Sequence, residues 1–392
     1  MTELFECLES RLTRRSFLKA GAASAVLSFA ALPEFTLGAE TSDNRLIIIL
    51  LRGGMDGLYA MPPIGDKNLS AHRKDLATDD VLKVDSFFGL HPAMKTLADL
   101  YKNGQALLVH GTSMPYTGRS HFEGQDIMQS GVMTPYASAS GWAGRALEVA
   151  GYGSITMSMP VPLVLRGEAY AQSRFPTWMR SPPPELYNRL APLWAADPQI
   201  SPYGAQIEAE ILDPTNTLPP INPGNDETPL PLLANDAVAR LKAPDGPRIA
   251  VLDYVGFDSH SRENIQHNVR LGGVDNAIRN IRLGMGDKWA NTLVVTVTEF
   301  GRTIAENGSW GTDHGWGSSI FVTGGLLKKS GIVADWPGLR SKDLYEGRDL
   351  KATIDSRALY AAIVSSVFQI DPDLVQRKVI QSPKDDRFSA YL

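Results

Sequence analysis

Short apolar runs that end in glycine or in polar residues recur along the chain. Each run is four to eight residues long, and most are rich in isoleucine, valine and leucine. Runs of this length and composition predict strands that are buried on both faces. The predicted strands are residues 46–51, 106–110, 161–165, 248–255, 293–297 and 320–323.

Segments with helical spacing lie between these runs. Leu359, Ile363 and Val367, for example, fall on one face of a helix predicted over residues 355–369. The other predicted helices include residues 91–101, 120–131, 141–150 and 278–283. Because strands and helices alternate, the sequence predicts an α/β fold with a largely parallel sheet and helices on both faces.

The first 39 residues have the pattern of an export signal. Residues 13–19 (TRRSFLK) look like a twin-arginine signature, a weakly apolar stretch follows at 20–32, and residues 37–39 fit a cleavage site. The apolar stretch is too short to span a bilayer. We therefore expect export by the twin-arginine translocation machinery, and a periplasmic or secreted mature protein without a stable membrane anchor.

The mature chain, residues 40–392, has the length and composition of one large α/β domain. A segment rich in proline, at about residues 213–232, predicts a long surface loop or a connector. The only cysteine, Cys7, lies within the signal, so the mature chain has no disulfide and no thiol ligand. The net charge is −5 without a basic cluster, so no nucleic-acid partner is expected.

Polar residues collect just beyond the carboxyl ends of the predicted strands. Carboxyl ends of parallel strands lie on one edge of a sheet, so these side chains are expected to converge. Carboxylates and imidazoles without sulfur are suitable ligands for Zn, Mn, Mg or Ca. The predicted metal ligands are Asp56, Asp258, His260, Glu299, Asp313 and His314.

Each of these residues also has an ordinary interpretation. Asp56 could be a turn residue, Glu299 could form a salt bridge with Arg302, and His314 could be a loop histidine. Together they predict a site for one or two divalent ions. Two ions would stabilise both the attacking and the leaving oxygen of a displacement at phosphorus or sulfur.

Ser120 is the predicted nucleophile. It stands at the start of a predicted helix, where free backbone N–H groups and the helix dipole favour an anionic substrate. Arg119 could hold phosphate or sulfate oxygens, and His121 is either a ligand or a packing residue. Ser120 also fits an ordinary helix cap, with Glu123 three residues later.

Six motifs together resemble an exported bacterial family, domain of unknown function 1501, which is related to the alkaline phosphatase and sulfatase superfamily. The motifs are LRGGMDGL (51–58), FFGLHPAM (87–94), PYTGRSHFEGQD (115–126), GFDSH (256–260), TEFGRT (298–303) and GTDHGWG (311–317). The resemblance covers nearly all of the mature chain. It implies an alkaline-phosphatase-like α/β core with a two-metal site.

By position, the resemblance implies that Asp56 is the first-strand metal ligand and Ser120 the hydroxyl nucleophile. Asp258 and His260 resemble one metal-binding pair, and His314 resembles a later ligand. Asp313 lies beside that later ligand.

The sequence also departs from the superfamily at three places. Ser120 lacks the usual surroundings of a phosphatase serine or a sulfatase cysteine. Residues 53–55 intervene between the first strand and its aspartate, and Glu299-Phe300 stand where the superfamily has an Asp-His pair. These departures leave open a one-metal enzyme or an inactive binding protein.

The sequence therefore predicts an exported, metal-dependent hydrolase of phosphate or sulfate esters. Its substrate would be an anionic small-molecule or polysaccharide ester. Two alternatives stay open. One is a non-catalytic periplasmic or cell-surface protein that keeps the fold for binding or assembly. The other is a metal-dependent isomerase or phosphotransferase of the same superfamily.

Overall fold

The computed structural model describes residues 42–77, 80–157, 161–169, 171–173, 184–198, 201, 230–244 and 246–392. The predicted export signal lies outside these residues, as does the predicted connector up to residue 229. The chain divides into two compact units, Met1–Thr41 and Ser42–Leu392, and every described element belongs to the second.

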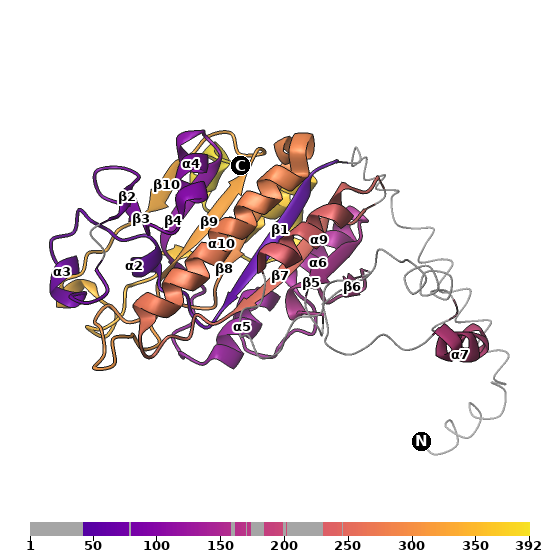
Figure 1. Cartoon of the computed structure of the whole chain (residues 1–392), viewed down its shortest axis with the longest axis horizontal. Helices are drawn as coiled ribbons and strands as arrows, with labels where there is room; N and C mark the ends of the chain where they lie inside the picture. Colours follow the sequence, from indigo (N-terminus) through magenta and orange to yellow (C-terminus); the bar gives the residue numbers. More distant parts are fainter. Residues whose placement is uncertain are drawn as a thin grey trace, which may run out of the picture. The chain divides into compact units, whose positions relative to one another are not determined.

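A nine-stranded sheet forms the centre of this second unit (Figure 1). Its order is β10 (Gly331–Ala334), β4 (Ala106–Ser113), β9 (Ser318–Gly324), β8 (Thr292–Val297), β1 (Arg45–Arg52), β7 (Ile249–Val255), β5 (Ser154–Met157) and β6 (Ala171–Ser173). The short β11 (Ile354–Asp355) pairs with β4. All of these pairings are parallel except those of β9, which is antiparallel to β4 and β8.

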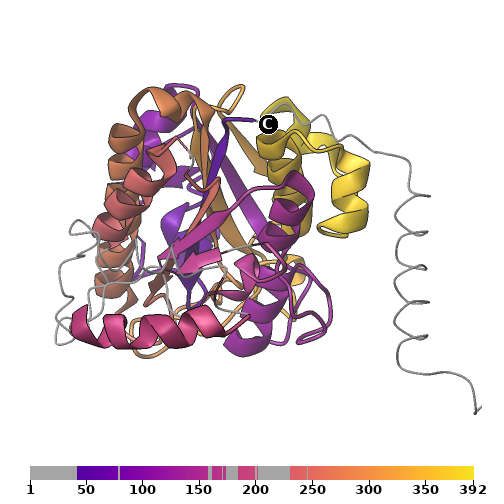
Figure 2. The same cartoon turned by 90° about the vertical axis from the view of Figure 1, so that its right-hand side faces the viewer.

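Residues of β1 alternate between two hydrophobic cores, as the pleat of a strand requires. Leu46, Ile48 and Leu50 face one core, whereas Ile47 and Ile49 face the other. The first core is completed by α5 (His121–Ser130), α6 (Trp142–Ala150), α11 (Ser356–Phe368) and α12 (Pro372–Lys378). The second is completed by α2 (Gly57–Ala60), α4 (Lys95–Lys102), α9 (Leu230–Lys242) and α10 (Glu263–Met285). Figure 2 shows α9 and α10 on the other side of the sheet from the C-terminal helices.

The remaining elements are short or peripheral. A separate hairpin joins β2 (Leu82–Lys83) to β3 (Gly89–Leu90), and two further α-helices are α3 (Leu69–His72) and α7 (Pro184–Ala196). The 3-10 helices are η1 (Leu163–Leu165), η3 (Gly286–Asn291), η4 (Ser341–Asp343) and η5 (Asp386–Ala390).

The predicted α/β class, with a largely parallel sheet covered on both faces, is confirmed. One predicted strand is wrong, because residues 163–165 form η1 rather than a strand. Pro162 precedes this turn and has no N–H for a sheet ladder, while Val164 and Leu165 are buried in the first core. The apolar pattern of residues 161–165 therefore indicates burial but not pairing in the sheet.

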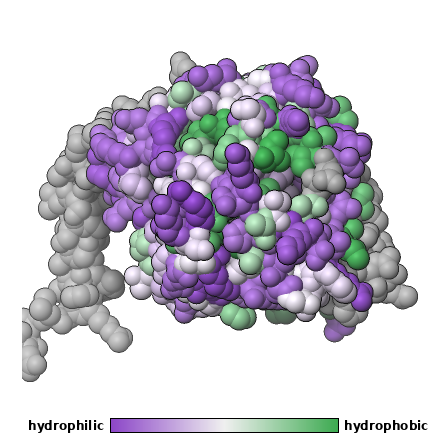
Figure 3. All heavy atoms as spheres, turned by 90° about the vertical axis from the view of Figure 1, so that its left-hand side faces the viewer, coloured by the Kyte–Doolittle hydropathy of each residue, from purple (hydrophilic) through white to green (hydrophobic). Residues whose placement is uncertain are grey.

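The exterior of the described part of the chain is largely polar. No helix in it is long and apolar enough to cross a membrane. Figure 3 shows a face that is mostly hydrophilic, with hydrophobic side chains gathered in its upper half. Exposed large hydrophobic side chains occur on separate elements, such as Phe122 on α5 and Leu283 on α10.

Candidate metal centre

The carboxyl ends of three adjacent strands, β8, β1 and β7, meet at the middle of one sheet edge. Because β9 is antiparallel, the loop of residues 298–317 that leaves β8 enters β9 at the same edge. β4 also ends there and leads into α5. Gly53, after β1, has φ +114, and a Cβ at this position would lie 2.3 Å from the backbone nitrogen of Asp258. A glycine is therefore needed at position 53 for the loop after β1 to approach the loop after β7 so closely.

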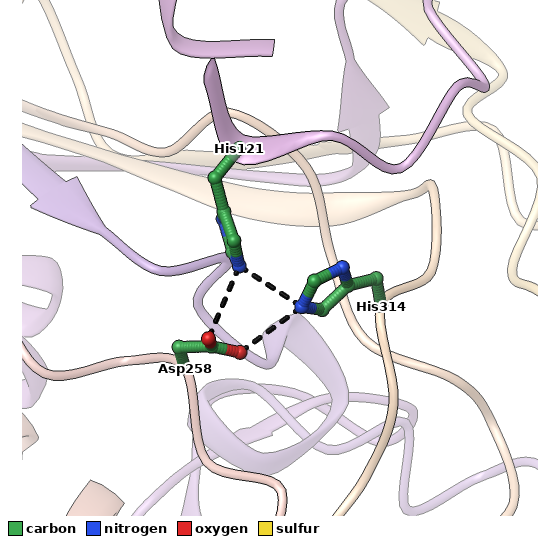
Figure 4. Close-up of side chains that lie close together, drawn as sticks. All are labelled: His121, Asp258 and His314. Atoms are coloured by element: carbon green, nitrogen blue, oxygen red, sulfur yellow. Dashed lines mark hydrogen bonds and ion pairs between the residues drawn. The ribbon is translucent and has the colours of Figure 1, made fainter. Parts of the chain in front are cut away.

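Three side chains from three of these segments point toward one another (Figure 4). Nε2 of His121 lies 2.9 Å from Nε2 of His314 and 3.3 Å from Oδ2 of Asp258. Nε2 of His314 lies 3.1 Å from Oδ1 of Asp258. Each residue offers one ligand atom, and these atoms all lie within 4.8 Å of one another, so the three side chains could hold a metal ion.

His260 extends this group to four side chains. Its Nε2 lies 2.9 Å from Oδ1 of Asp258 and 3.0 Å from Nε2 of His314. The side chains of His260 and Asp258 are 47% and 44% exposed, whereas those of His121 and His314 are 21% and 23% exposed. The cluster is therefore open to solvent on the side of His260.

The second ring nitrogen of each histidine meets an oxygen acceptor. Nδ1 of His121 lies 2.8 Å from Oε1 of Glu299, and Nδ1 of His314 lies 2.9 Å from the carbonyl oxygen of Arg119. Nδ1 of His260 lies 3.1 Å from an oxygen of Asp313. Metal-binding histidines have this arrangement, in which one nitrogen binds the ion and the other donates to an oxygen.

These contacts require a protonation state of His314 that leaves a lone pair for a cation. A backbone carbonyl cannot donate, so Nδ1 of His314 carries the hydrogen and Nε2 presents a lone pair. That lone pair faces the Nε2 atoms of His121 and His260 and the carboxylate of Asp258. Groups of this kind repel one another at hydrogen-bond distance unless a proton or a metal ion lies among them. Three imidazoles and one carboxylate are a suitable ligand set for zinc or a similar ion.

The surrounding charges keep the carboxylate ionised. Burial would raise the pKa of Asp258, but the Arg302 guanidinium, 2.9 Å from Oδ1, and the neighbouring histidines lower it to about 2. Burial lowers the pKa of His314. Burial also opposes the charged form of His121, but the Glu299 and Asp258 carboxylates outweigh it and raise the pKa. Arg302 itself is fully buried and also donates to Thr312.

Asp56 does not join the cluster. Its Oδ1 accepts hydrogen bonds from the backbone N–H groups of Leu58 and Tyr59, and its Oδ2 pairs with the buried Arg73. Burial would raise the pKa of Asp56, but the Arg73 guanidinium lowers it to about 2. In this structure Asp56 is a helix cap and the ion-pair partner of Arg73, and its role as a metal ligand stays a prediction.

Glu299 and Asp313 contact the Nδ1 atoms of His121 and His260 rather than the converging Nε2 atoms, and their roles as metal ligands stay predictions. Glu299 is fully buried, and its Oε1 accepts from Gly53 N and Gln125 Nε2 in addition to His121. Both carboxylates were predicted because they follow or precede the right strands. Sequence position alone does not show whether such a carboxylate meets the ion or the far side of an imidazole.

The predicted catalytic residues lie in different surroundings. The guanidinium of Arg119 donates to Asp349 and Glu346, and its carbonyl oxygen accepts from His314. That Arg119 holds substrate oxygens stays a prediction. Ser120 occupies the N-cap position of α5, but its side chain makes no cap hydrogen bond. The residue is partly exposed, and its backbone N–H donates to the hydroxyl of Tyr116. Its role as the nucleophile stays a prediction.

A buried polar network, which the sequence pattern does not reveal, lies beneath the cluster. Glu263 and His267, on α10, are both fully buried; Thr312 donates to Glu263, and His267 accepts from the backbone N–H of Asp56. Burial and the nearby Asp56 raise the pKa of Glu263 well above its usual value. Both residues precede the helix predicted over 278–283, and no strand end marks them in the sequence.

Comparisons with known proteins support the family resemblance. Residues 215–380 match the model of a family described as protein of unknown function (DUF1501). No curated protein matches the chain.

Several solved structures are similar to this chain in part. Murine ectonucleotide pyrophosphatase/phosphodiesterase 5 has a TM-score of 0.42 and 10% identity, covering 88% of this chain and 98% of that one. The lipoteichoic acid synthase LtaP from Listeria monocytogenes has a TM-score of 0.41 and 10% identity, covering 91% and 79%. Alkaline phosphatase from the Antarctic bacterium TAB5 has a TM-score of 0.36 and 9% identity, covering 74% and 94%. What the cluster can do follows from its own residues.

Proposed function

We propose that this chain is an exported, metal-dependent hydrolase of phosphate or sulfate esters. The observation that supports it is the convergence of three imidazole Nε2 atoms on the Asp258 carboxylate. Each imidazole is held from behind by an oxygen acceptor, as in a built metal site. The export part of the proposal rests on the twin-arginine signature at residues 13–19.

The proposed site takes one ion, held by His121, His260, His314 and Asp258. Three imidazoles favour Zn over Mg or Ca, which prefer oxygen ligands. When bound, such an ion would polarise the ester and stabilise the negative charge that develops in an in-line displacement. A single ion is proposed because Asp56, the main candidate for a second site, is paired with Arg73.

The chain's own residues would bind and attack the ester. The first N–H groups of α5 have no partner within the helix, and they favour an anion beside His121. Ser120 stands at this helix start with a hydroxyl free of the cap bond. Its oxygen would form a bond to phosphorus or sulfur while the alcohol leaves with a proton. Water would then displace the serine and release phosphate or sulfate.

Metal analysis combined with an activity screen tests this proposal. We expect about one equivalent of a divalent transition ion per chain and multiple turnover of nitrophenyl phosphate or nitrophenyl sulfate. Asp258→Ala and His314→Ala should each lose the ion and at least about a hundredfold in kcat/KM. His72→Gln is the matched control, because the ring of His72 contacts the carbonyl of Leu339 away from the cluster.

Three outcomes separate the parts of the proposal. If the cluster variants bind as much metal as the control, the metal site is refuted. If Ser120→Ala keeps its ion and its full rate, the hydrolase stands but the nucleophile is not Ser120. Metal without any turnover would favour the non-catalytic alternative.

A further inference from the structure

We propose that a basic cavity at the far end of α5 is a second binding site, which takes a phosphate- or sulfate-bearing anion. The cavity has a volume of about 510 Å³. It lies between the loop that follows α5, the start of α6 and the end of α12. This proposal does not depend on the reaction proposed for the metal centre.

The composition of the lining supports an anionic ligand. Four cationic side chains line the cavity, and none of its described lining residues is an aspartate or glutamate. Three hydroxyl side chains also line the cavity, and that of Ser138 donates to the carbonyl oxygen of Ser140. The cationic residues are Arg145, Arg357, Arg377 and Lys378, and the hydroxyl residues are Thr134, Ser138 and Ser140. This concentration of positive charge occurs in a chain whose net charge is −5.

Arg145 is a fixed cation in the wall of the cavity. Its guanidinium donates to the carbonyl oxygens of Ser130, Ser140 and Val379 at 2.7 to 2.8 Å. Carbonyls hold the group in place but do not neutralise its charge. Burial lowers the pKa of Arg145, and the charge of Glu148 opposes this only in part. A partly buried charge without a contacting counter-ion is unfavourable, so a bound anion would relieve it.

The helix dipole does not explain this arginine. Basic residues at a helix C-terminus, such as Arg377 and Lys378 on α12, are favourable without any ligand. Arg145 lies instead near the N-terminus of α6, where a cation is disfavoured. This helix has no acidic residue in its first turn and no side-chain cap at Gly141. A bound anion would satisfy both the helix start and the arginine.

Two of the other cations are available to a ligand. Arg377 and Lys378 are exposed, and in the part of the chain that the structure describes neither has an ion-pair partner. Arg357, by contrast, pairs with Asp355 at 2.6 Å. Three unpaired cations around one cavity suit a ligand with more than one negative charge.

The cavity is separate from the metal centre. His121 is the first residue of α5, and Gly131, its C-cap, lines the cavity. A helix of 10 residues is about 15 Å long, so one small anion cannot occupy both places. The anionic group could belong to a free anion or to a charged polymer.

Titration calorimetry with two probes tests the site, and it distinguishes a free anion from a charged polymer as the ligand. The probes are inorganic pyrophosphate, as a free anion, and dextran sulfate, as a polymer. Titrations use both the wild-type chain and an Asp258→Ala background, since either probe could also bind at the metal centre. The test variant is Arg377→Gln/Lys378→Gln. The control is Lys95→Gln/Lys102→Gln, which removes two charges from α4 instead.

We expect at least one probe to bind in both backgrounds, more weakly as salt increases. The Arg377→Gln/Lys378→Gln pair should raise the Kd for that probe by about tenfold or more, while the α4 pair changes it less than about twofold. Neither pair should change ester hydrolysis. Equal Kd values for the two double variants would overturn the proposal. So would a wild-type chain that binds neither probe at millimolar concentration.

Discussion

Glu299 lies wholly inside the protein, yet it remains ionised. Burial would raise the pKa of Glu299, but hydrogen bonds from His121, Gly53 and Gln125 lower it. Its charge therefore holds the His121 ring in one orientation, with Nε2 toward Asp258. Asp313 has the same role for His260, but its side chain is 52% exposed and water can compete with it.

This difference in burial predicts unequal effects of two matched substitutions. Glu299→Gln should weaken metal binding by about ten- to a hundredfold, because the buried partner of His121 loses its charge. Asp313→Asn should weaken it by less than about tenfold, because solvent replaces much of that contact. Competition with a chromophoric chelator measures both affinities. Equal losses in the two variants would contradict the proposed roles.

At the scale of elements, the proposed metal centre depends on how closely the ends of β1 and β7 approach each other. A Cβ on Gly53 would overlap the backbone of Phe257 and Asp258, at a φ of +114 that side chains rarely adopt. Gly104 also has a positive φ, +79, but nothing lies within 4 Å of its Cβ position.

Gly53→Ala should therefore lower the free energy of unfolding by about 3 kcal/mol or more, from strain and overlap together. Gly104→Ala should lower it by only about 1 kcal/mol, from backbone conformation alone. Urea unfolding of the metal-free proteins measures both values. Equal stability of the two variants would mean that Gly53 is not required for the close approach of the two loops.

The sequence is sufficient to predict five of the nine strands of the central sheet, β1, β4, β7, β8 and β9, since runs such as residues 46–51 are continuously apolar. It also marked His260 and His314, because both follow strand ends or precede a strand. The sequence does not show which atoms of the cluster a carboxylate meets, as Glu299 illustrates: it contacts Nδ1 of His121 rather than the Nε2 atoms that converge on Asp258. That distinction depends on which side of an imidazole a carboxylate meets, and this is set by packing between segments that the chain pattern does not describe.

At the scale of the whole molecule, buried histidines link folding to pH. Burial lowers the pKa of His91 to about 4, of His110 to about 4 and of His267 to about 3. All three are neutral in the folded protein, whereas in the unfolded chain they take up protons near their ordinary pKa of 6.5. Glu263 acts in the opposite sense, because its raised pKa makes the folded state hold a proton that the unfolded state releases.

Stability should therefore fall as pH decreases from about 6.5 to 4, with about two protons taken up on unfolding near pH 5. This corresponds to about 3 kcal/mol per pH unit. Urea unfolding of the metal-free protein at several pH values measures the slope. His110→Gln should reduce the number of protons taken up on unfolding by about one. An unchanged slope would mean that His110 is not neutral in the folded state.

The antiparallel course of β9 has a consequence for how the chain could come to hold an ion. His121 and His314 are 193 residues apart, and the loop that carries His314 stays at this sheet edge because the antiparallel β9 starts there. No short fragment contains the four donors, so affinity for the ion arises only when the whole sheet has formed. Binding would then stabilise the folded state by mass action, about 2.7 kcal/mol when the free ion is a hundredfold above its Kd. A bound ion would therefore indicate that the segments that carry the four donor side chains have folded together.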